Sequence, residues 1–238
     1  MRTVTAVAHR GDPYRVRENT LPSIASALER GADAVEVDVR TTRDGVPVLL
    51  HDETLKRLWD FDRPLAELPH AEVAEVTGGG VPTLRQALMA AGAHRVMLDL
   101  PGATEESVRK VVNTVRECGA GERVYYCAGP VAMLWVRRAD PAAEIALTWT
   151  RPAPPRPALV EAVRPRWLNY RFGLLSSDLV ARAHRDGLLV SAWTPDTART
   201  QRRLIAHGVD AITTNRLDTL SAVLSERQAT RGGAPDPS

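Results

Sequence analysis

Two carboxylates lie two residues apart in the apolar segment AVEVDVR, as Glu36 and Asp38. In a β-strand, successive side chains point to opposite faces, so the valines of this segment face one way and the two carboxylates the other. Two like charges on one buried face are costly unless a cation neutralises them or one of them is protonated. The pair therefore predicts a bound cation, and ion pairing with arginines is the alternative that the sequence leaves open.

A turn after this strand brings a histidine toward the carboxylates. The Asp44-Gly45 dipeptide is a β-hairpin signal, and a turn centred on it pairs residues whose numbers sum to about 89. His51 then lies opposite Asp38 and on the same face, as cross-strand neighbours do. A slip of one residue in this register would point His51 away. His9 ends the preceding strand, so two histidines converge on the carboxylate pair.

Asp99 is a third candidate ligand, because it interrupts the apolar segment VMLDL, where an aspartate needs a partner. Three carboxylates without a cysteine ligand favour a hard cation such as Mg²⁺ or Ca²⁺ over zinc. Cys118 and Cys127 have no metal-binding spacing, and we interpret both as buried thiols. Arg10 follows His9 and offers the planar set of donors that phosphate oxygens prefer.

These residues need a scaffold that brings strand ends together. Strand-like and helix-like segments alternate along the chain, which is typical of a parallel sheet with crossover helices. Nine strands are predicted, over residues 3–9, 34–40, 47–51, 95–100, 123–128, 144–149, 166–171, 188–193 and 211–214. The segment TTRDGV between the second and third strands is too short for a parallel crossover, so residues 47–51 are an antiparallel return. Eight parallel strands remain, which favours an α/β fold of the (β/α)8 TIM barrel type over an open doubly wound sheet.

The chain length of 238 residues fits one large domain, over residues 1–226, with a flexible tail at 227–238. We expect residues 52–81, with scattered charges and a glycine run, to form an excursion over the barrel mouth.

A net charge of +2 does not suggest a nucleic-acid binder. No segment resembles a signal peptide or is apolar enough to span a membrane, so we expect a cytoplasmic protein without stable membrane insertion.

A series of short motifs also runs along the chain in order. They are HRG (9–11), ENT (18–20), GADAVEVDV (31–39), TRDGVPVLLHD (42–52), VPTL (81–84), AWT (192–194) and GVDAITTN (208–215). In this order and spacing, from residue 7 to about 220, the sequence closely resembles the glycerophosphodiester phosphodiesterase family. The resemblance implies a barrel of the phosphatidylinositol phospholipase C type, in agreement with the strand count.

Carried onto this sequence, the resemblance implies that His9 and His51 are the general acid and base, and that Glu36 and Asp38 hold a divalent metal ion. Arg10 would contact the phosphate. The expected reaction is hydrolysis of a glycerophosphodiester, or of a related small phosphodiester, to an alcohol and a phosphomonoester. The resemblance also implies that a neighbouring hydroxyl of the substrate is the nucleophile, forming a cyclic phosphate that water then opens.

The strand that carries Asp99 departs from the family pattern. The family has Glu-x-Lys there, with the glutamate as the third metal ligand, whereas this chain has Asp99, Leu100 and Pro101. Aspartate can still coordinate the ion, but its side chain is one methylene shorter. Proline cannot replace the charge of the lysine, so either Arg10 alone contacts the phosphate or another cation contributes. The candidates for that cation are Arg43, Lys56 and Arg171.

The motifs near the end of the chain also differ from the family pattern. Asp196 stands where asparagine is commoner, and Asn215 replaces an aspartate. We expect Trp193 to line the substrate pocket, with a place in the core as the alternative. Glu18 and Asn19, in the ENT segment, are expected either to contact the site residues from behind or to fix the loop around the site.

Two other functions stay open. The missing lysine is compatible with a lyase that releases the cyclic phosphate, and also with a non-catalytic protein that binds a phosphate ligand. In each case the expected partner is a small-molecule phosphodiester, and the sequence does not predict the oligomeric state. Four further histidines lie in predicted loops or polar helical faces and are interpreted as surface residues; they are His70, His94, His184 and His207.

Overall fold

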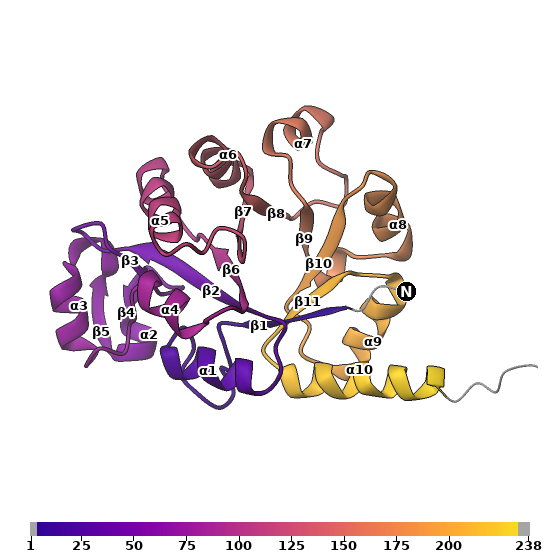
Figure 1. Cartoon of the computed structure of the whole chain (residues 1–238), viewed down its shortest axis with the longest axis horizontal. Helices are drawn as coiled ribbons and strands as arrows, with labels where there is room; N and C mark the ends of the chain where they lie inside the picture. The colour runs from indigo at the N-terminus through magenta and orange to yellow at the C-terminus, as the bar shows by residue number, and fades with distance from the viewer. Residues whose placement is uncertain (1–3, 233–238) are drawn as a thin grey trace, which may run out of the picture.

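Eight parallel strands close into a barrel in the computed structural model, which describes residues 4–232 (Figure 1). Each strand pairs with its neighbour in parallel, and the ring closes where β1 pairs with both β2 and β11. The strands are β1 (Thr5–His9), β2 (Ala34–Thr41), β6 (Arg95–Asp99), β7 (Val124–Ala128), β8 (Glu144–Trp149), β9 (Trp167–Arg171), β10 (Leu189–Trp193) and β11 (Ala211–Thr214). The predicted (β/α)8 barrel is confirmed.

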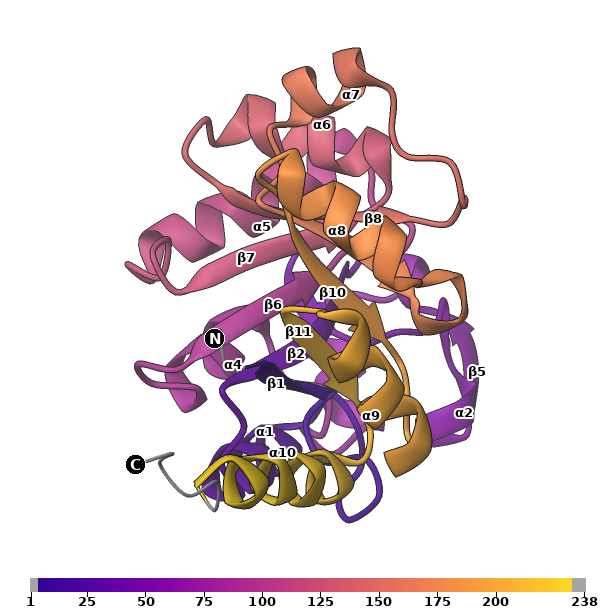
Figure 2. The same ribbon diagram turned by 90° about the vertical axis from the view of Figure 1, so that its right-hand side faces the viewer.

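Helices surround the ring of strands on the outside (Figures 1 and 2). They are α1 (Leu21–Glu29), α4 (Leu84–Ala90), α5 (Glu105–Glu117), α6 (Pro130–Ala139), α7 (Pro157–Val163), α8 (Ser177–Arg185), α9 (Ala198–His207) and α10 (Leu217–Gly232). Five of them begin at a serine or threonine whose side chain accepts a hydrogen bond from a first-turn backbone N–H. In the described part of the chain, no helix is long and apolar enough to cross a membrane.

The last helix runs into the predicted flexible tail at 227–238, because α10 continues to Gly232. Residues 233–238 lie outside the described residues.

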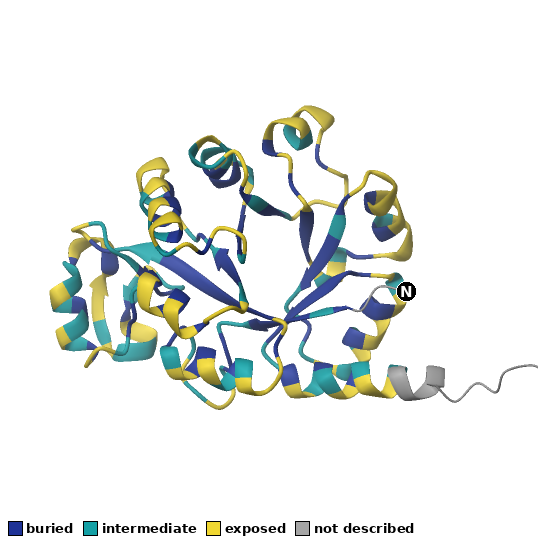
Figure 3. Cartoon of the chain, in the orientation of Figure 1, coloured by how far each residue is buried: buried dark blue, intermediate teal, exposed yellow. Residues whose placement is uncertain are grey.

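The inside of the barrel changes from apolar to polar along the strands. A cluster of side chains fills the lower and middle part of the interior, formed by Val7, Ala34, Met97, Tyr125, Cys127, Ala146, Trp167 and Ala211, and its upper members Met97 and Cys127 reach the pocket described below. Alternation then places Glu36 two residues after Ala34, and Asn169 two residues after Trp167, on the same inward face. The outward faces of the strands pack under the helices, so the strands are buried while the outer helical faces are exposed (Figure 3). The barrel is therefore closed below and polar at its carboxyl-terminal end.

The hairpin after β2 has a register that differs by one residue from the prediction. In β3 (Pro47–Leu49), Leu49 pairs with Val39, and the backbone N–H of Leu50 donates to the carbonyl of Asp38. Leu50 rather than His51 therefore lies opposite Asp38, and the predicted cross-strand pair of Asp38 and His51 is wrong.

The turn itself explains the shift. A hydrogen bond from the backbone N–H of Thr42 to the carbonyl of Val46 closes a loop of three residues, so the turn is centred on Asp44 alone. Gly45 has a φ of +81°, the left-handed conformation that this kind of three-residue hairpin requires. His51 consequently lies beyond the end of β3, in the loop that leads into the excursion.

Residues 52–81 form a small layer of their own beside the barrel. Its elements are β4 (Thr54–Leu55), α2 (Lys56–Trp59), β5 (Phe61–Pro64), a 3-10 turn (Leu65–Glu67) and α3 (His70–Val76). They share a separate apolar cluster with β3, formed by Val48, Leu50, Leu55, Leu65, Leu68, Val73 and Val81. Figure 1 shows these elements to one side of the ring of strands, beyond β3. None of these residues lines the pocket described below.

Candidate active site

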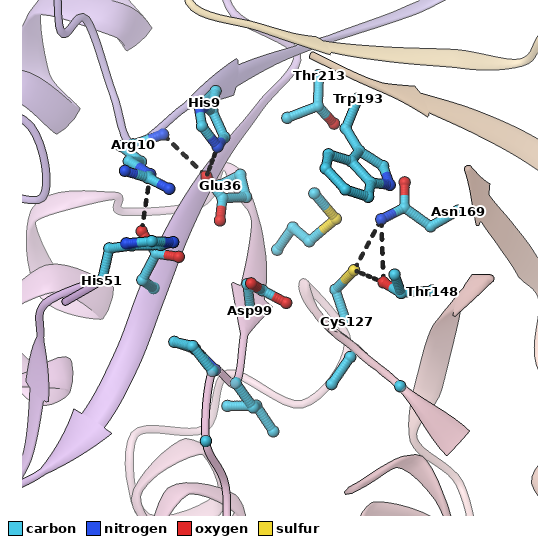
Figure 4. Close-up of a pocket in the computed structure, with 17 residues that line it drawn as sticks. His9, Arg10, Glu36, His51, Asp99, Cys127, Thr148, Asn169, Trp193 and Thr213 are labelled. Carbon is cyan, nitrogen blue, oxygen red and sulfur yellow. Dashed lines mark hydrogen bonds and ion pairs between the residues drawn. The ribbon is translucent and has the colours of Figure 1, made fainter. Parts of the chain in front are cut away.

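A pocket of about 390 Å³ opens at the carboxyl-terminal ends of the strands, which is the end where barrel enzymes hold their chemistry (Figure 4). It is lined by all seven residues that the sequence singled out, together with ten others. The seven are His9, Arg10, Glu36, Asp38, His51, Asp99 and Trp193. Strands β1, β2, β6 and β10 and the loops that follow β1 and β3 bring them together.

Three carboxylates converge on one point of the pocket. Glu36, Asp38 and Asp99 each offer an oxygen, and these oxygens lie within 4.8 Å of one another. Asp38 and Asp99 are direct neighbours in the pairing of β2 with β6. Burial, together with the charges of Asp38 and then Asp99, raises the pKa of Glu36 well above its ordinary value. Burial and the charge of Asp38 raise the pKa of Asp99 to about 7.

Such a cluster fits a divalent metal ion. Three buried carboxylate oxygens at this spacing form an oxygen donor set without sulfur or nitrogen, which hard cations prefer. A cation would also relieve the mutual repulsion that raises both pKa values. The shorter side chain of Asp99 still reaches the cluster, so the change from glutamate leaves the third oxygen in place.

Arg10 is held against these carboxylates from two sides. Its Nη1 donates to Oε1 of Glu18 at 2.9 Å, and its Nε lies 3.0 Å from Oδ2 of Asp38 in an ion pair. Its backbone N–H donates to Oε2 of Glu36 at 2.9 Å. The loop needs Gly11 next in sequence, because a Cβ there would lie 2.6 Å from the backbone of Ser23, at a φ of +86°.

The ENT segment fixes Asp38. The side-chain amide of Asn19 donates to Oδ2 of Asp38 at 2.7 Å, and its Oδ1 accepts the backbone N–H of Asp38 at 3.1 Å. Asn19 adopts a φ of +55°, a backbone conformation that asparagine tolerates better than most residues. These contacts match the loop-fixing role expected of the segment.

His9 makes a hydrogen bond through Nδ1, whereas its Nε2 faces the carboxylate cluster. Its Nδ1 lies 2.7 Å from Oδ1 of Asn215, whose own amide nitrogen donates to Asp196 at 2.8 Å. Because the amide oxygen can only accept, Nδ1 of His9 carries the proton and Nε2 keeps its lone pair. That Nε2 lies 3.8 Å from Oε2 of Glu36. Burial, and then the charge of Arg10, lowers the pKa of His9, which favours the neutral imidazole.

His51 has a charged partner instead. Its Nδ1 lies 2.7 Å from Oδ1 of Asp52, and Nε of Arg57 donates to the other oxygen of that carboxylate. The bond from Arg57, and then the one from His51, lowers the pKa of Asp52 to about 2, so Asp52 is ionised. Because an ionised carboxylate can only accept, Nδ1 of His51 donates to Asp52, and its Nε2 is left for the substrate. The sequence analysis did not single out Asp52, although it directly follows His51, and no local pattern signals Arg57 from within the excursion.

The wall across the pocket from the carboxylates is uncharged (Figure 4). The side-chain amide of Asn169 donates to Sγ of Cys127 at 3.1 Å, and Cys127 lies 3.2 Å from the hydroxyl of Thr148. Cys127 is buried, as predicted, and burial raises the pKa of its thiol well above the ordinary value. Cys118 is only partly buried, and both thiols are free.

The three cations proposed as substitutes for the lysine do not line the pocket. Arg43 donates to the carbonyl of Glu67 and Lys56 pairs with Asp60, while Arg171 is exposed at the end of β9.

A cation that the sequence analysis did not consider lies closer. Arg40 follows Glu36 and Asp38 on the same face of β2, one step nearer the mouth. Its Nε donates to the carbonyl of His51 at 2.7 Å, and a Cβ at Gly102 would lie 3.0 Å from its Nη1. Arg40 does not itself line the pocket; it lies in a neighbouring hollow that shares Pro101 and Gly102 with the pocket, so its guanidinium lies beside the pocket rim.

Comparison with known proteins places this arrangement in a family. The model of the glycerophosphoryl diester phosphodiesterase family matches residues 9–219. A probable glycerophosphodiester phosphodiesterase 2 of Mycobacterium tuberculosis is 31% identical, over 93% of this chain and 91% of that protein. A glycerophosphodiester phosphodiesterase of Caldanaerobacter subterraneus is 28% identical, over 90% of this chain and 95% of that protein.

Solved structures agree on the fold. A glycerophosphoryl diester phosphodiesterase structure from Silicibacter pomeroyi superposes with a TM-score of 0.84 at 24% identity, covering 95% of each chain. A phosphodiesterase of Oleispira antarctica, solved with sn-glycerol-3-phosphate, superposes with a TM-score of 0.83 at 24% identity, covering 93% of this chain and 96% of that one. Together with the match over residues 9–219, these likenesses show that the chain belongs to the glycerophosphoryl diester phosphodiesterase family and is a phosphodiesterase.

Proposed function

We propose that this chain hydrolyses glycerophosphodiesters to an alcohol and sn-glycerol 3-phosphate with the help of Mg²⁺ or Ca²⁺. The observation that carries the proposal is the cluster of carboxylate oxygens from Glu36, Asp38 and Asp99 in one pocket with two histidines. These three residues would hold the ion. When bound, the ion would stabilise the negative charge that grows on the phosphoryl oxygens.

The partners of the two histidines support a division of labour between them. His9, with its proton on Nδ1 and a lowered pKa, is suited to accept a proton at Nε2. His51, beside the ionised Asp52, is suited to donate one. Each proton transfer by a positioned group typically contributes about 10²–10⁴ in rate.

The reaction then has two steps. Nε2 of His9 accepts the proton of the substrate hydroxyl next to the phosphate, and that oxygen attacks phosphorus. The bond from phosphorus to the leaving alcohol breaks as His51 gives this alcohol its proton. In the second step, His51 takes a proton from water, whose oxygen opens the cyclic phosphate, and His9 returns its proton to the glycerol oxygen.

Two arginines would contact the phosphate in this proposal. Arg10 is largely engaged by Glu18 and Asp38, whereas the terminal nitrogens of Arg40 have no hydrogen-bond partner in the described part of the chain. A guanidinium with free donors beside the pocket rim would be suited to a phosphoryl oxygen. Arg40 therefore takes the place that the missing lysine leaves open.

Replacing Arg40 with glutamine tests this assignment. We expect kcat/KM for glycerophosphocholine to fall roughly 10- to 100-fold, the range for losing a hydrogen bond to a charged group. Arg40→Lys should recover part of the loss, because it keeps the charge without the planar geometry. Arg43→Gln is the matched control and should change kcat/KM less than about twofold, because Arg43 contacts only the excursion. Equal losses in the Arg40 and Arg43 variants would contradict a phosphate contact.

The direct test of the proposed function follows the phosphorus atom. Purified protein is incubated with glycerophosphocholine and Mg²⁺ or Ca²⁺, and the products are followed by phosphorus NMR. We expect sn-glycerol 3-phosphate, which is also the molecule bound by the structural neighbour from Oleispira antarctica. A cyclic phosphate that accumulates without opening would favour a lyase instead. No turnover of a panel of glycerophosphodiesters with either ion would overturn the proposal.

A further inference from the structure

Three polar side chains form a row that ends at His9. This histidine is the last residue of β1, Asn215 follows β11, and Asp196 lies in the loop after β10; the three strands are consecutive in the barrel (Figure 1). Nδ1 of His9 lies 2.7 Å from Oδ1 of Asn215, and Nδ2 of Asn215 donates to Oδ2 of Asp196 at 2.8 Å. One amide therefore separates the imidazole from a carboxylate.

The direction of this amide depends on Asp196. The oxygen and the nitrogen of an asparagine side chain have nearly the same shape, so their hydrogen-bond partners decide which atom faces which neighbour. A carboxylate only accepts, so the amide nitrogen of Asn215 must face Asp196. The amide oxygen then faces His9, which must carry its proton on Nδ1. Nε2 of His9, on the side of Glu36, is left with its lone pair.

The carboxylate of Asp196 is itself fixed by a group that cannot turn over. Its Oδ1 accepts the backbone N–H of Asn215 at 2.9 Å, and the hydroxyl of Thr214 lies 2.9 Å from the same oxygen. Because a backbone N–H can only donate, an oxygen is required at this position whichever residue stands at 196. Neither Asp196 nor Asn215 lines the pocket, so neither contacts a substrate bound there.

We propose that Asp196 is a positioning residue, which sets the tautomer of His9 through the amide of Asn215. The inference rests on the proposed function, in which Nε2 of His9 accepts a proton from the substrate. It adds the group that keeps this nitrogen free of a proton before the reaction. Asp196 thus acts on the reaction without contacting any reacting atom.

Replacing Asp196 with asparagine should invert the tautomer, because the side chain keeps its size and loses one acceptor. The new amide must place its oxygen at the backbone N–H of Asn215, so its nitrogen takes the position of Oδ2. That nitrogen would face Nδ2 of Asn215, donor against donor, so the amide of Asn215 turns over. Its nitrogen then donates to Nδ1 of His9, and the proton of the ring moves to Nε2, where it prevents proton acceptance.

Nuclear magnetic resonance of the full chain with ¹⁵N-labelled histidine measures the tautomer without substrate. At about pH 8, where histidine is neutral, we expect the proton on Nδ1 in wild type and on Nε2 in Asp196→Asn. A spectrum of His9→Gln identifies the signals of His9. In parallel, kcat for glycerophosphocholine should fall roughly 10- to 100-fold in Asp196→Asn, because the reactive tautomer then sets two donors against each other. KM should change less than about twofold.

The exchange of the two residues, Asp196→Asn with Asn215→Asp, is the decisive rescue. It keeps the total charge and every hydrogen bond of the row. The new carboxylate at position 215 accepts from the amide at 196 and from Nδ1 of His9, so the double variant should regain the wild-type tautomer and most of kcat. Asp33→Asn is the matched control, because Asp33 accepts the backbone N–H of Ala6 at the other end of β1. It should change neither the tautomer of His9 nor kcat.

Three results would overturn the role of Asp196. They are a wild type with the proton on Nε2, a loss of kcat in Asp196→Asn with an unchanged tautomer, and a double variant that keeps the proton on Nε2. Should Asp196→Asn not fold, the double variant alone decides, since it keeps every bond. Because the tautomer is measured apart from turnover, a protein that shows the switch without hydrolysing diesters would support the role of Asp196 and overturn the proposed function.

Discussion

His51→Ala is expected to slow the cleavage of glycerophosphocholine by about 10²–10⁴, while slowing the cleavage of the p-nitrophenyl ester of glycerol 3-phosphate less than about tenfold. The reason lies in the leaving group. Choline leaves as an alkoxide and needs the proton that His51 supplies, whereas p-nitrophenolate is stable without one. Both substrates carry the same neighbouring hydroxyl, so the attacking side of the reaction is unchanged. Initial rates under saturating metal ion measure the two ratios.

The complementary variant is His9→Ala, which should slow both substrates by a similar factor, because both need the hydroxyl to lose its proton. Asp52→Asn should act in the same direction as His51→Ala but more weakly, since an amide holds Nδ1 of His51 less firmly than the carboxylate does. His70→Ala, in the excursion, is the control for histidine removal. If His51→Ala slowed both substrates equally, while His9→Ala spared the p-nitrophenyl ester, the two roles would have to be exchanged.

Glu36→Gln is expected to lower kcat/KM by at least roughly 10² and to remove most of the stabilisation that Mg²⁺ or Ca²⁺ gives the wild type. The substitution keeps the size of the side chain, and the amide oxygen can still accept the backbone N–H of Arg10. What it removes is one of three negative charges around the ion. Chelation of the wild-type protein should abolish turnover, and added ion should restore it.

The same variant should behave in the opposite way without an ion. The pKa of Glu36 is raised in the folded protein, so its ionised form destabilises the fold at neutral pH, and glutamine removes this cost. The unfolding midpoint of the ion-free variant should therefore exceed that of the ion-free wild type. Glu106→Gln, at an exposed helical position, is the matched control and should change neither the midpoint nor its response to the ion. An unchanged response to the ion in Glu36→Gln would remove Glu36 from the metal site.

Much of the barrel could be predicted because its signals are local. Valines alternate with carboxylates around Glu36 and Asp38, and each strand-like segment is followed by a helix or a long connection. Closure of eight such units then brings the strand ends together, whatever the details of the loops. For this reason all seven predicted residues line one pocket, although they come from four strands and two loops.

The hairpin register is a feature that local sequence signals did not predict correctly. The Asp44-Gly45 dipeptide predicts a turn, but either a two-residue or a three-residue loop accommodates it. The hydrogen bond between Thr42 and Val46 selects the longer loop, and His51 moves past the end of β3. His51 still reaches the pocket because the loop after β3, and not the strand pairing, positions it.

The sequence by itself determined the fold, the carboxylate cluster and the two histidines, because strand alternation and motif order are properties of neighbouring residues. Only the tertiary structure decided what lies beside each of these groups. Asn215 is 206 residues from His9, and Arg40, which no motif marks, reaches the wall that Gly102 forms. Such contacts depend on how distant strand ends and loops meet in space, and on side-chain conformations that spacing does not encode.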